Sequence, residues 1–176
     1  MKFNETVIAG AFVVEMEPIE DERGYFARAW CHKEFAAHGM CCDFVQSNVS
    51  YNNHKNTLRG MHFQREPYQE IKLVRCIKGR IYDVIVDLRT DSETYLQSVG
   101  VELKGDGKSA LYIPKGVAHG FQTLENDSAV LYMHSEYFVA EAASGLRWDD
   151  PKLAIEWPDA DTRITSEKDT SWPLLD

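Results

Sequence analysis

The segment Ile81–Leu88 alternates strictly between two sets of side chains, and this alternation constrains the fold more than any other feature. Its odd-numbered positions hold two isoleucines and two aspartates, and its even-numbered positions hold a tyrosine, two valines and a leucine. Successive side chains of a β-strand point to opposite faces of a sheet, so a period of two predicts a strand with at least one buried face.

Similar short segments recur along the chain, separated by Gly-, Pro- and Asn-rich turns. Many short strands at close spacing predict an all-β sandwich or barrel, with a ligand site at the barrel mouth. Helix is scarce: we expect a short one at Lys33–His38 and another beginning at Ser166, whose capping-box pattern favours a helix start. The further predicted strands are Phe12–Met16, Phe44–Ser50, Ile71–Ile77, Ser98–Leu103, Ala110–Ile113 and Ala129–Tyr137.

Length, charge and cysteine content limit the class of protein. A chain of 176 residues with 44% hydrophobic residues fits one domain, residues 1–176. The net charge of −9 and the lack of a long basic run argue against nucleic acid or an anionic membrane as partner. The N-terminus does not resemble a signal peptide, and no apolar run is long enough for a membrane helix. We expect a cytoplasmic protein with reduced thiols at Cys31, Cys41, Cys42 and Cys76.

Two segments carry candidate chemistry, Thr57–Gln64 and Tyr112–Phe121. The second contains Pro-x-Gly-x-x-His, a tight turn that delivers His119 onto the next strand, as cupin-like barrels do. Metal-binding cupins add a His-x-His pair and a glutamate, but here the pair reads His62-Phe63-Gln64, and an amide is a poor ligand for a transition metal. We therefore predict no metal; a weaker site of His62, Glu70 and His119 is the alternative.

Several ordered blocks together resemble the dTDP-4-dehydrorhamnose 3,5-epimerase family, from about Ala11 to Leu175. The resemblance implies a cupin-type jelly-roll β-barrel with a few short peripheral helices, and no cofactor. It also implies a homodimer that exchanges an N-terminal arm of about residues 1–30, and a nucleotide-sugar substrate. The blocks are Arg59–Gln64, Lys72–Arg75, Asp83–Arg89, Tyr112–Phe121, Val130–Tyr132 and Arg147–Pro151.

The same resemblance assigns catalytic roles for inversion next to a C4 ketone, a reaction that needs a base, an oxyanion stabiliser and an opposed acid. It makes His62 the base, Asp169 its carboxylate partner, Lys72 the oxyanion stabiliser and Tyr132 the acid. Each has a structural alternative: a satisfied barrel-wall histidine, a capping residue, a lysine at a strand edge and a packed aromatic. Lys72 shares a strand face with apolar residues, so it needs an anionic partner, which the enolate would supply.

The remaining positions carried over from the family concern substrate binding. Arginine and lysine side chains can clamp a diphosphate, and two aromatic rings can sandwich a nucleotide base. Phe26 and Tyr137 are the expected aromatic pair. The polar candidates are Arg23, Gln46, Asn48, Arg59, His119 and Lys168.

The chain departs from the family pattern at four places that do not carry the proposed acid, base or oxyanion group. Arg28 and Ala143 stand where glutamates are usual; Gln46–Val49 and Met133-His134 also differ. Losing a carboxylate and gaining a guanidinium reverses local charge, which is compatible with a different ligand polarity. An epimerase at C3 or C5 alone, on a different nucleotide sugar, therefore stays open, as do a metal-dependent cupin and a non-catalytic sugar-binding cupin.

Overall fold

The computed structural model describes residues 1–40, 43–105 and 107–175; two of the four cysteines, Cys41 and Cys42, lie outside the described residues. Within the described residues the chain forms thirteen strands and two short helices. In chain order these are β1 (Lys2–Glu5), β2 (Phe12–Glu15), β3 (Ile19–Asp21), β4 (Gly24–Phe26), α1 (His32–Ala37), β5 (Gln46–Asn52), β6 (Leu58–Gln64), β7 (Lys72–Lys78), β8 (Arg80–Asp87), β9 (Ser98–Lys104), β10 (Ser109–Ile113), β11 (Val117–Thr123), β12 (Ser128–His134), β13 (Ala143–Gly145) and α2 (Glu167–Ser171).

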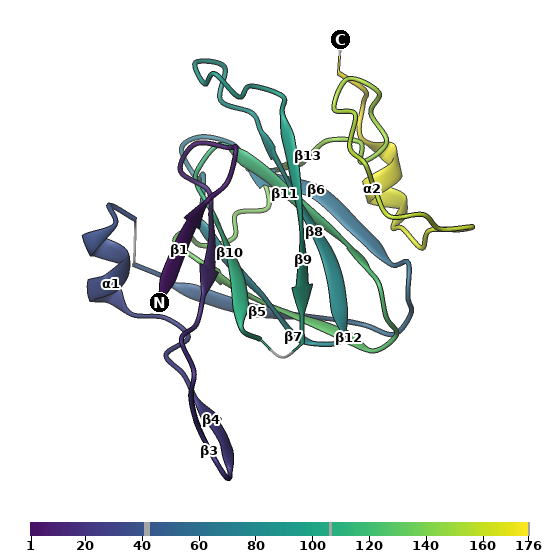
Figure 1. Ribbon diagram of the computed structural model, residues 1–176. Coiled ribbons are helices and arrows are strands. Elements are labelled where there is room, and N and C mark those ends of the chain that lie inside the picture. The colour runs from purple at the N-terminus through teal and green to yellow at the C-terminus, as the bar shows by residue number, and fades with distance from the viewer. Residues whose placement is uncertain (41–42, 106, 176) are drawn as a thin grey trace.

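Eleven of the described strands form two antiparallel sheets that enclose the interior of a barrel, and β3 and β4 form a separate two-stranded ribbon (Figure 1). One sheet has the order β1-β2-β10-β7-β12-β5, and the other has the order β13-β6-β11-β8-β9. Strands distant in sequence are neighbours in both sheets, as in a jelly roll. The predicted all-β, cupin-type jelly-roll barrel with short peripheral helices is therefore confirmed.

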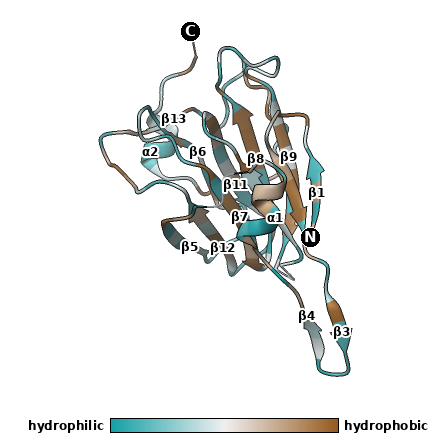
Figure 2. Cartoon of the chain, turned by 90° about the vertical axis from the view of Figure 1, so that its left-hand side faces the viewer, coloured by the Kyte–Doolittle hydropathy of each residue, from teal (hydrophilic) through white to brown (hydrophobic). Residues whose placement is uncertain are grey.

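Three apolar clusters explain why strands such as β8 are buried on both faces. Between the sheets, Ile81 and Ile85 join residues of both sheets in the central cluster. On the outer face of the five-stranded sheet, Val84 and Val86 pack under the chain that follows β13, including Leu153. Figure 2 shows the hydrophobic colour running along β8. A third cluster lies on the outer face of the six-stranded sheet, where α1 places Phe35.

The seven predicted strands are all present, with shifted ends. The largest shift is at the end of β12, which stops at His134 where a strand to Tyr137 was expected. The first helix starts and ends one residue early, and Ser166 caps α2 through a hydrogen bond of 3.1 Å from the Asp169 N–H to its Oγ. The prediction listed no strand for β1, β3, β4 or β13, which have three or four residues each and show little alternation. It also listed none for the seven-residue β6 and β11, whose apolar alternation is interrupted by Gly60 and Gly120.

The β3–β4 hairpin extends away from the barrel, below α1 and β1 in Figure 1. Its side chains are exposed although two are large and apolar: Ile19 is 72% exposed and Phe26 is 76% exposed. A two-stranded ribbon with an exposed apolar surface is marginal by itself in water. The hairpin therefore has the physical character of a segment that packs against another surface.

Gly60 lets β6 approach β11 closely. Its φ is +132°, and a Cβ there would lie 2.5 Å from the Cα of Gly120 and 3.0 Å from the carbonyl oxygen of His119. Side chains rarely occupy that φ region, so only glycine fits without strain. The close approach brings the histidines of both strands into register, because His119 is the cross-strand partner of His62.

We expect Gly60→Ala to lower the free energy of unfolding by roughly 3 kcal/mol or more, because backbone strain and a backbone collision add. Gly24→Ala is the matched control: its φ is +126°, but nothing lies within 4 Å of the added Cβ. Urea denaturation should therefore show a clearly smaller loss for Gly24→Ala. Equal losses for the two variants would contradict the close-packing explanation.

Candidate active site

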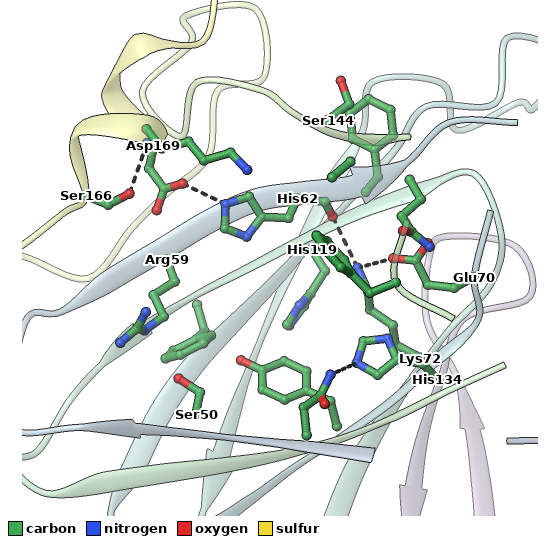
Figure 3. A pocket seen from close by; sticks show the side chains of 18 of the residues that line it. Ser50, Arg59, His62, Glu70, Lys72, His119, His134, Ser144, Ser166 and Asp169 are labelled. Atoms are coloured by element: carbon green, nitrogen blue, oxygen red, sulfur yellow. Dashed lines mark hydrogen bonds and ion pairs between the residues drawn. The ribbon is translucent and has the colours of Figure 1, made fainter. Parts of the chain in front are cut away.

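A cavity of about 430 Å³ opens between the sheets, lined by residues of β5, β6, β7, β11, β12, β13 and the α2 region. Figure 3 shows side chains from these elements converging on it. Eight of the twelve predicted site residues line this cavity. They are Asn48, Arg59, His62, Lys72, His119, Tyr132, Lys168 and Asp169.

His62 and Asp169 are hydrogen-bonded to each other in the wall of the cavity. His62 Nε2 lies 2.6 Å from Asp169 Oδ1, with the carboxylate side chain 4% exposed and the imidazole 44% exposed. The second carboxylate oxygen accepts a longer hydrogen bond, 3.4 Å, from the Gly60 N–H. The backbone N–H of Asp169 donates to Ser166 Oγ, the oxygen that caps α2. Asp169 therefore takes part in the helix cap through its backbone and pairs with His62 through its side chain.

Asp169 is ionised in this environment. Burial alone would raise the pKa of its carboxyl, but the hydrogen bond and charge of the His62 ring, with the Gly60 N–H, outweigh burial and lower the pKa below its usual value. An ionised carboxylate at Nε2 fixes the orientation and the tautomer of the imidazole.

A second histidine–aspartate pair lies directly beside the first. His119 Nε2 is 2.7 Å from Asp83 Oδ1, and the two side chains are 5% and 0% exposed. Asp83 was not among the predicted site residues. The signal was present, however: the alternation places this carboxylate between two isoleucines on a buried face of β8, where an unpaired charge is costly.

Tyr132 stands against this second pair. Its ring meets the His119 ring edge-on with centroids 5.8 Å apart, and it packs against the central apolar cluster. Burial, reinforced by the negative charge of Asp83, raises the pKa of the Tyr132 hydroxyl despite the opposing charge of Arg59. The phenol therefore stays protonated at neutral pH and is available as a proton donor.

Lys72 is buried, as its place on the strand face predicted. Its Nζ lies 2.9 Å from Glu70 Oε1 and 3.3 Å from the carbonyl oxygen of His62 (Figure 3). The Lys72 and Glu70 side chains are 9% and 7% exposed. The expected anionic partner is therefore present within the protein before any enolate forms, a role that the sequence interpretation had left to the ligand.

The alternative metal site of His62, Glu70 and His119 does not form in the described part of the chain, where no three or more His, Cys, Asp or Glu side chains gather as a metal site. Each histidine Nε2 is engaged by an aspartate, and the Glu70 carboxylate holds an ammonium group. A cation would have to displace Lys72 to use that carboxylate.

The cavity rim carries polar and cationic groups. The Arg59 guanidinium donates to Asn52 Oδ1 at 2.7 Å, and Lys168 Nζ lies 5.7 Å from the centre of the Trp172 ring. Asn48 Nδ2 is 3.5 Å from His134 Nε2. Two positive charges at the mouth can hold an anionic group even though the whole chain is acidic.

Comparison with known proteins agrees with this geometry. The sequence profile of dTDP-4-dehydrorhamnose 3,5-epimerase matches residues 5–176. A dTDP-4-dehydrorhamnose 3,5-epimerase of Methanothermobacter thermautotrophicus is 43% identical over 99% of this chain and 94% of its own length. A solved epimerase of that name from Bacillus anthracis, with TDP and PPi bound, has a TM-score of 0.95 at 43% identity, covering 99% of both chains.

A dTDP-6-deoxy-D-glucose-3,5-epimerase from Legionella pneumophila, in complex with dTDP-4-keto-L-rhamnose, has a TM-score of 0.92 at 36% identity, covering 98% of this chain and 92% of its own. The chain belongs to the dTDP-4-dehydrorhamnose 3,5-epimerase family. The resemblance drawn from its motifs is thus confirmed, and with it the class of enzyme, an isomerase. No helix in the described residues of this epimerase-family chain is long and apolar enough to cross a membrane.

Four of the residues predicted to bind substrate do not line the cavity of this chain. Arg23 pairs with Asp21 at the tip of the hairpin, and Phe26 is exposed beside it. Gln46 accepts a hydrogen bond from the Phe138 N–H at 3.1 Å, and Tyr137 is 61% exposed.

The two lost glutamates have different consequences. Arg28 is exposed and pairs with Glu34 of α1 at 2.7 Å, outside the cavity of its own chain. Ala143 lines the cavity, so the missing carboxylate leaves space at the wall formed by β13. Of these two, only Ala143 alters the polarity of the cavity within one chain; of the other departures, Val49 and His134 also line the cavity.

The lowered pKa of Asp169 predicts a pH-dependent contribution to stability. A carboxyl whose folded pKa lies below its ordinary value of 3.8 stabilises the fold above about pH 4 and loses that contribution as pH falls through the folded pKa. Asp169→Asn should therefore lower the free energy of unfolding near neutral pH, and its difference from wild type should shrink below about pH 4.

Urea denaturation across this pH range tests the prediction, with the exposed Asp159→Asn as control. A stability difference for Asp169→Asn that is the same at about pH 2 and at about pH 7 would contradict the linkage, because these pH values lie more than one unit below and above the ordinary aspartate pKa.

Proposed function

We propose that this chain inverts C3 and C5 of a dTDP-linked 4-keto-6-deoxyhexose without a cofactor. The observation that carries the proposal is one cavity containing an Asp-held imidazole, a half-buried phenol and a buried ammonium group. These are the base, the acid and the oxyanion stabiliser that inversion beside a ketone requires. The solved relatives named above, with TDP or a 4-keto sugar nucleotide bound, support this substrate class.

His62 is the base. Asp169 accepts a hydrogen bond from Nε2–H, which leaves Nδ1 with a free lone pair; Figure 3 shows this nitrogen on the cavity side of the ring. Nδ1 takes the proton from C3 or C5, and the C–H electron pair forms a C=C bond while the carbonyl electrons move to O4. The resulting imidazolium is stabilised by the ionised Asp169.

Lys72 and Tyr132 complete the inversion. The Lys72 ammonium donates to the enolate oxygen, where its charge is worth more in a buried site than in water. The Tyr132 hydroxyl then gives its proton to the carbon from the opposite face and the ketone re-forms. The phenolate takes a proton from solvent and the His62 imidazolium releases one to solvent, which restores both groups. The raised pKa of Tyr132 makes its phenolate a strong base, so it is reprotonated readily.

The binding half of the site extends beyond one chain. Arg59 and Lys168 bind the diphosphate, with Asn48 and His119 as further polar contacts. The nucleotide base is held by Tyr137 and by Phe26 of a second subunit, whose hairpin also brings Arg23. Exposure of the hairpin residues in the single chain supports this homodimer with exchanged arms. The cytoplasmic location and the role of Gln46 stay predictions.

Hydrogen exchange in deuterated water tests the chemistry. With a dTDP-linked 4-keto-6-deoxyglucose, we expect wild type to incorporate deuterium at C3 and C5. His62→Ala should lose roughly 100-fold or more of the exchange rate, the usual effect of removing a general base. Tyr132→Phe should permit exchange while impairing inversion, because the base still acts but the opposed donor is gone. Proton NMR follows both.

His32→Ala, which removes an exposed histidine of α1, is the control and should exchange at the wild-type rate. Normal exchange by His62→Ala would overturn the mechanism. Exchange by wild type at one carbon alone would replace the proposal by the single-centre epimerase, and no exchange by wild type with any 4-keto sugar nucleotide would favour a binding protein.

Subunit complementation tests the exchanged arm. His62→Ala and Arg23→Ala are each expected to be weakly active homodimers. An equal mixture of the two variants is unfolded and refolded, so that heterodimers form. In each heterodimer one pocket combines a wild-type His62 with a wild-type Arg23 from the partner's arm, and the other pocket carries both substitutions. Random pairing should therefore restore about a quarter of wild-type activity. Activity no higher than the mean of the two parents would exclude an arm that serves the partner's site.

A further inference from the structure

Glu70 carries a buried oxygen that the fold leaves unsatisfied. Its side chain is 7% exposed and lines the cavity just before β7. Oε1 holds the Lys72 ammonium at 2.9 Å, whereas Oε2 is buried and has no hydrogen-bond partner among the described residues. An unsatisfied carboxylate oxygen costs free energy in the free protein, so a donor from a bound molecule would be favoured there.

Lys72 has one N–H left for a ligand. An ammonium group has three donors, and here Glu70 Oε1 and the His62 carbonyl oxygen take two of them. The third is therefore fixed in direction by two protein contacts. His134 is the cross-strand partner of Lys72, and burial lowers its pKa to about 4, so its ring is neutral at pH 7. Lys72 is thus the cation at this corner of the cavity.

The free donor of Lys72 and the free acceptor of Glu70 belong to two groups that are joined at 2.9 Å, so neighbouring oxygens of one sugar can meet both. In a 4-keto-6-deoxyhexose the carbon on one side of the ketone carries a hydroxyl, at C3, and the carbon on the other side carries a methyl group. An acceptor beside the ketone-binding donor can therefore be met only by the C3 hydroxyl.

We propose that Glu70 is a positioning and specificity residue that recognises the hydroxyl beside the ketone. Oε1 orients Lys72 toward O4, and Oε2 accepts a hydrogen bond from the C3 hydroxyl. The pair binds an α-hydroxyketone as a unit and so fixes the sugar ring relative to His62. This inference rests on the proposed epimerase function and specifies the substrate feature that the same site selects.

The test compares deuterium exchange at C5 for two substrates, the 4-keto-6-deoxyhexose nucleotide and its 3-deoxy analogue. Wild type should exchange the 3-hydroxy substrate roughly 10-fold or more faster in kcat/KM, the usual penalty when a site built for a hydroxyl meets an analogue without one. Glu70→Met, similar in length but without a strong acceptor, should lose most of that preference. It should also slow both substrates, because Lys72 loses its anchor.

Glu70→Gln separates positioning from bulk structure. Its amide oxygen can still accept from Lys72, and its amide group can still bond a hydroxyl, so we expect kcat/KM within about 5-fold of wild type. Glu66→Gln, an exposed carboxylate of the same loop, is the control and should match wild type. If Glu70→Met does not fold, Glu70→Ala carries the same comparison.

The outcomes separate this inference from the proposed function. A wild type that exchanges nothing defeats the function itself. A wild type that exchanges normally, together with a Glu70→Met enzyme whose preference for the 3-hydroxy substrate is unchanged, overturns the role of Glu70 alone.

Discussion

The hydrogen bond of 2.6 Å between His62 and Asp169 joins residues 107 positions apart and depends on much of the fold. Asp169 reaches the barrel because Ser166 starts α2 at the right place, and because its carboxylate also accepts from the N–H of Gly60. Gly145 has no side chain where the indole of Trp172 lies, so the helix can approach β13 closely. The C-terminal segment thus acts as part of the catalytic wall, although no sheet includes it.

Alternation in the sequence was sufficient to predict the β architecture, because β8 and its neighbours repeat the period-two pattern in long, buried segments. The pattern also placed Lys72 on an inward face. It could not predict which strands are neighbours, since pairing is set by contacts between distant segments. The family motifs supplied His62 and Asp169, whereas Asp83 was missed because its partner, His119, lies 36 residues away on another strand.

Short elements were the hardest to predict. The hairpin formed by β3 and β4 and the three residues of β13 are too brief to show a period, and their pairing is decided by packing. The same limit applies to Glu70, which the sequence suggested only as a weak metal ligand. Its contact with Lys72 depends on the path of the loop before β7, and a loop path is not encoded by alternation.

The cavity separates charge in a way that the net charge of the chain does not reveal. Carboxylates on or just behind its walls each pair with one ionisable side chain: Asp169 with His62, Asp83 with His119 and Glu70 with Lys72. At the rim Arg59 bonds a neutral amide, so its positive charge is not cancelled by that contact. An anionic ligand is therefore drawn to the mouth while the reacting carbons face side chains held in place by their partners. Preorganisation of this kind means that little has to reorient when the proton moves, which is how a site of ordinary side chains can act on a weak carbon acid.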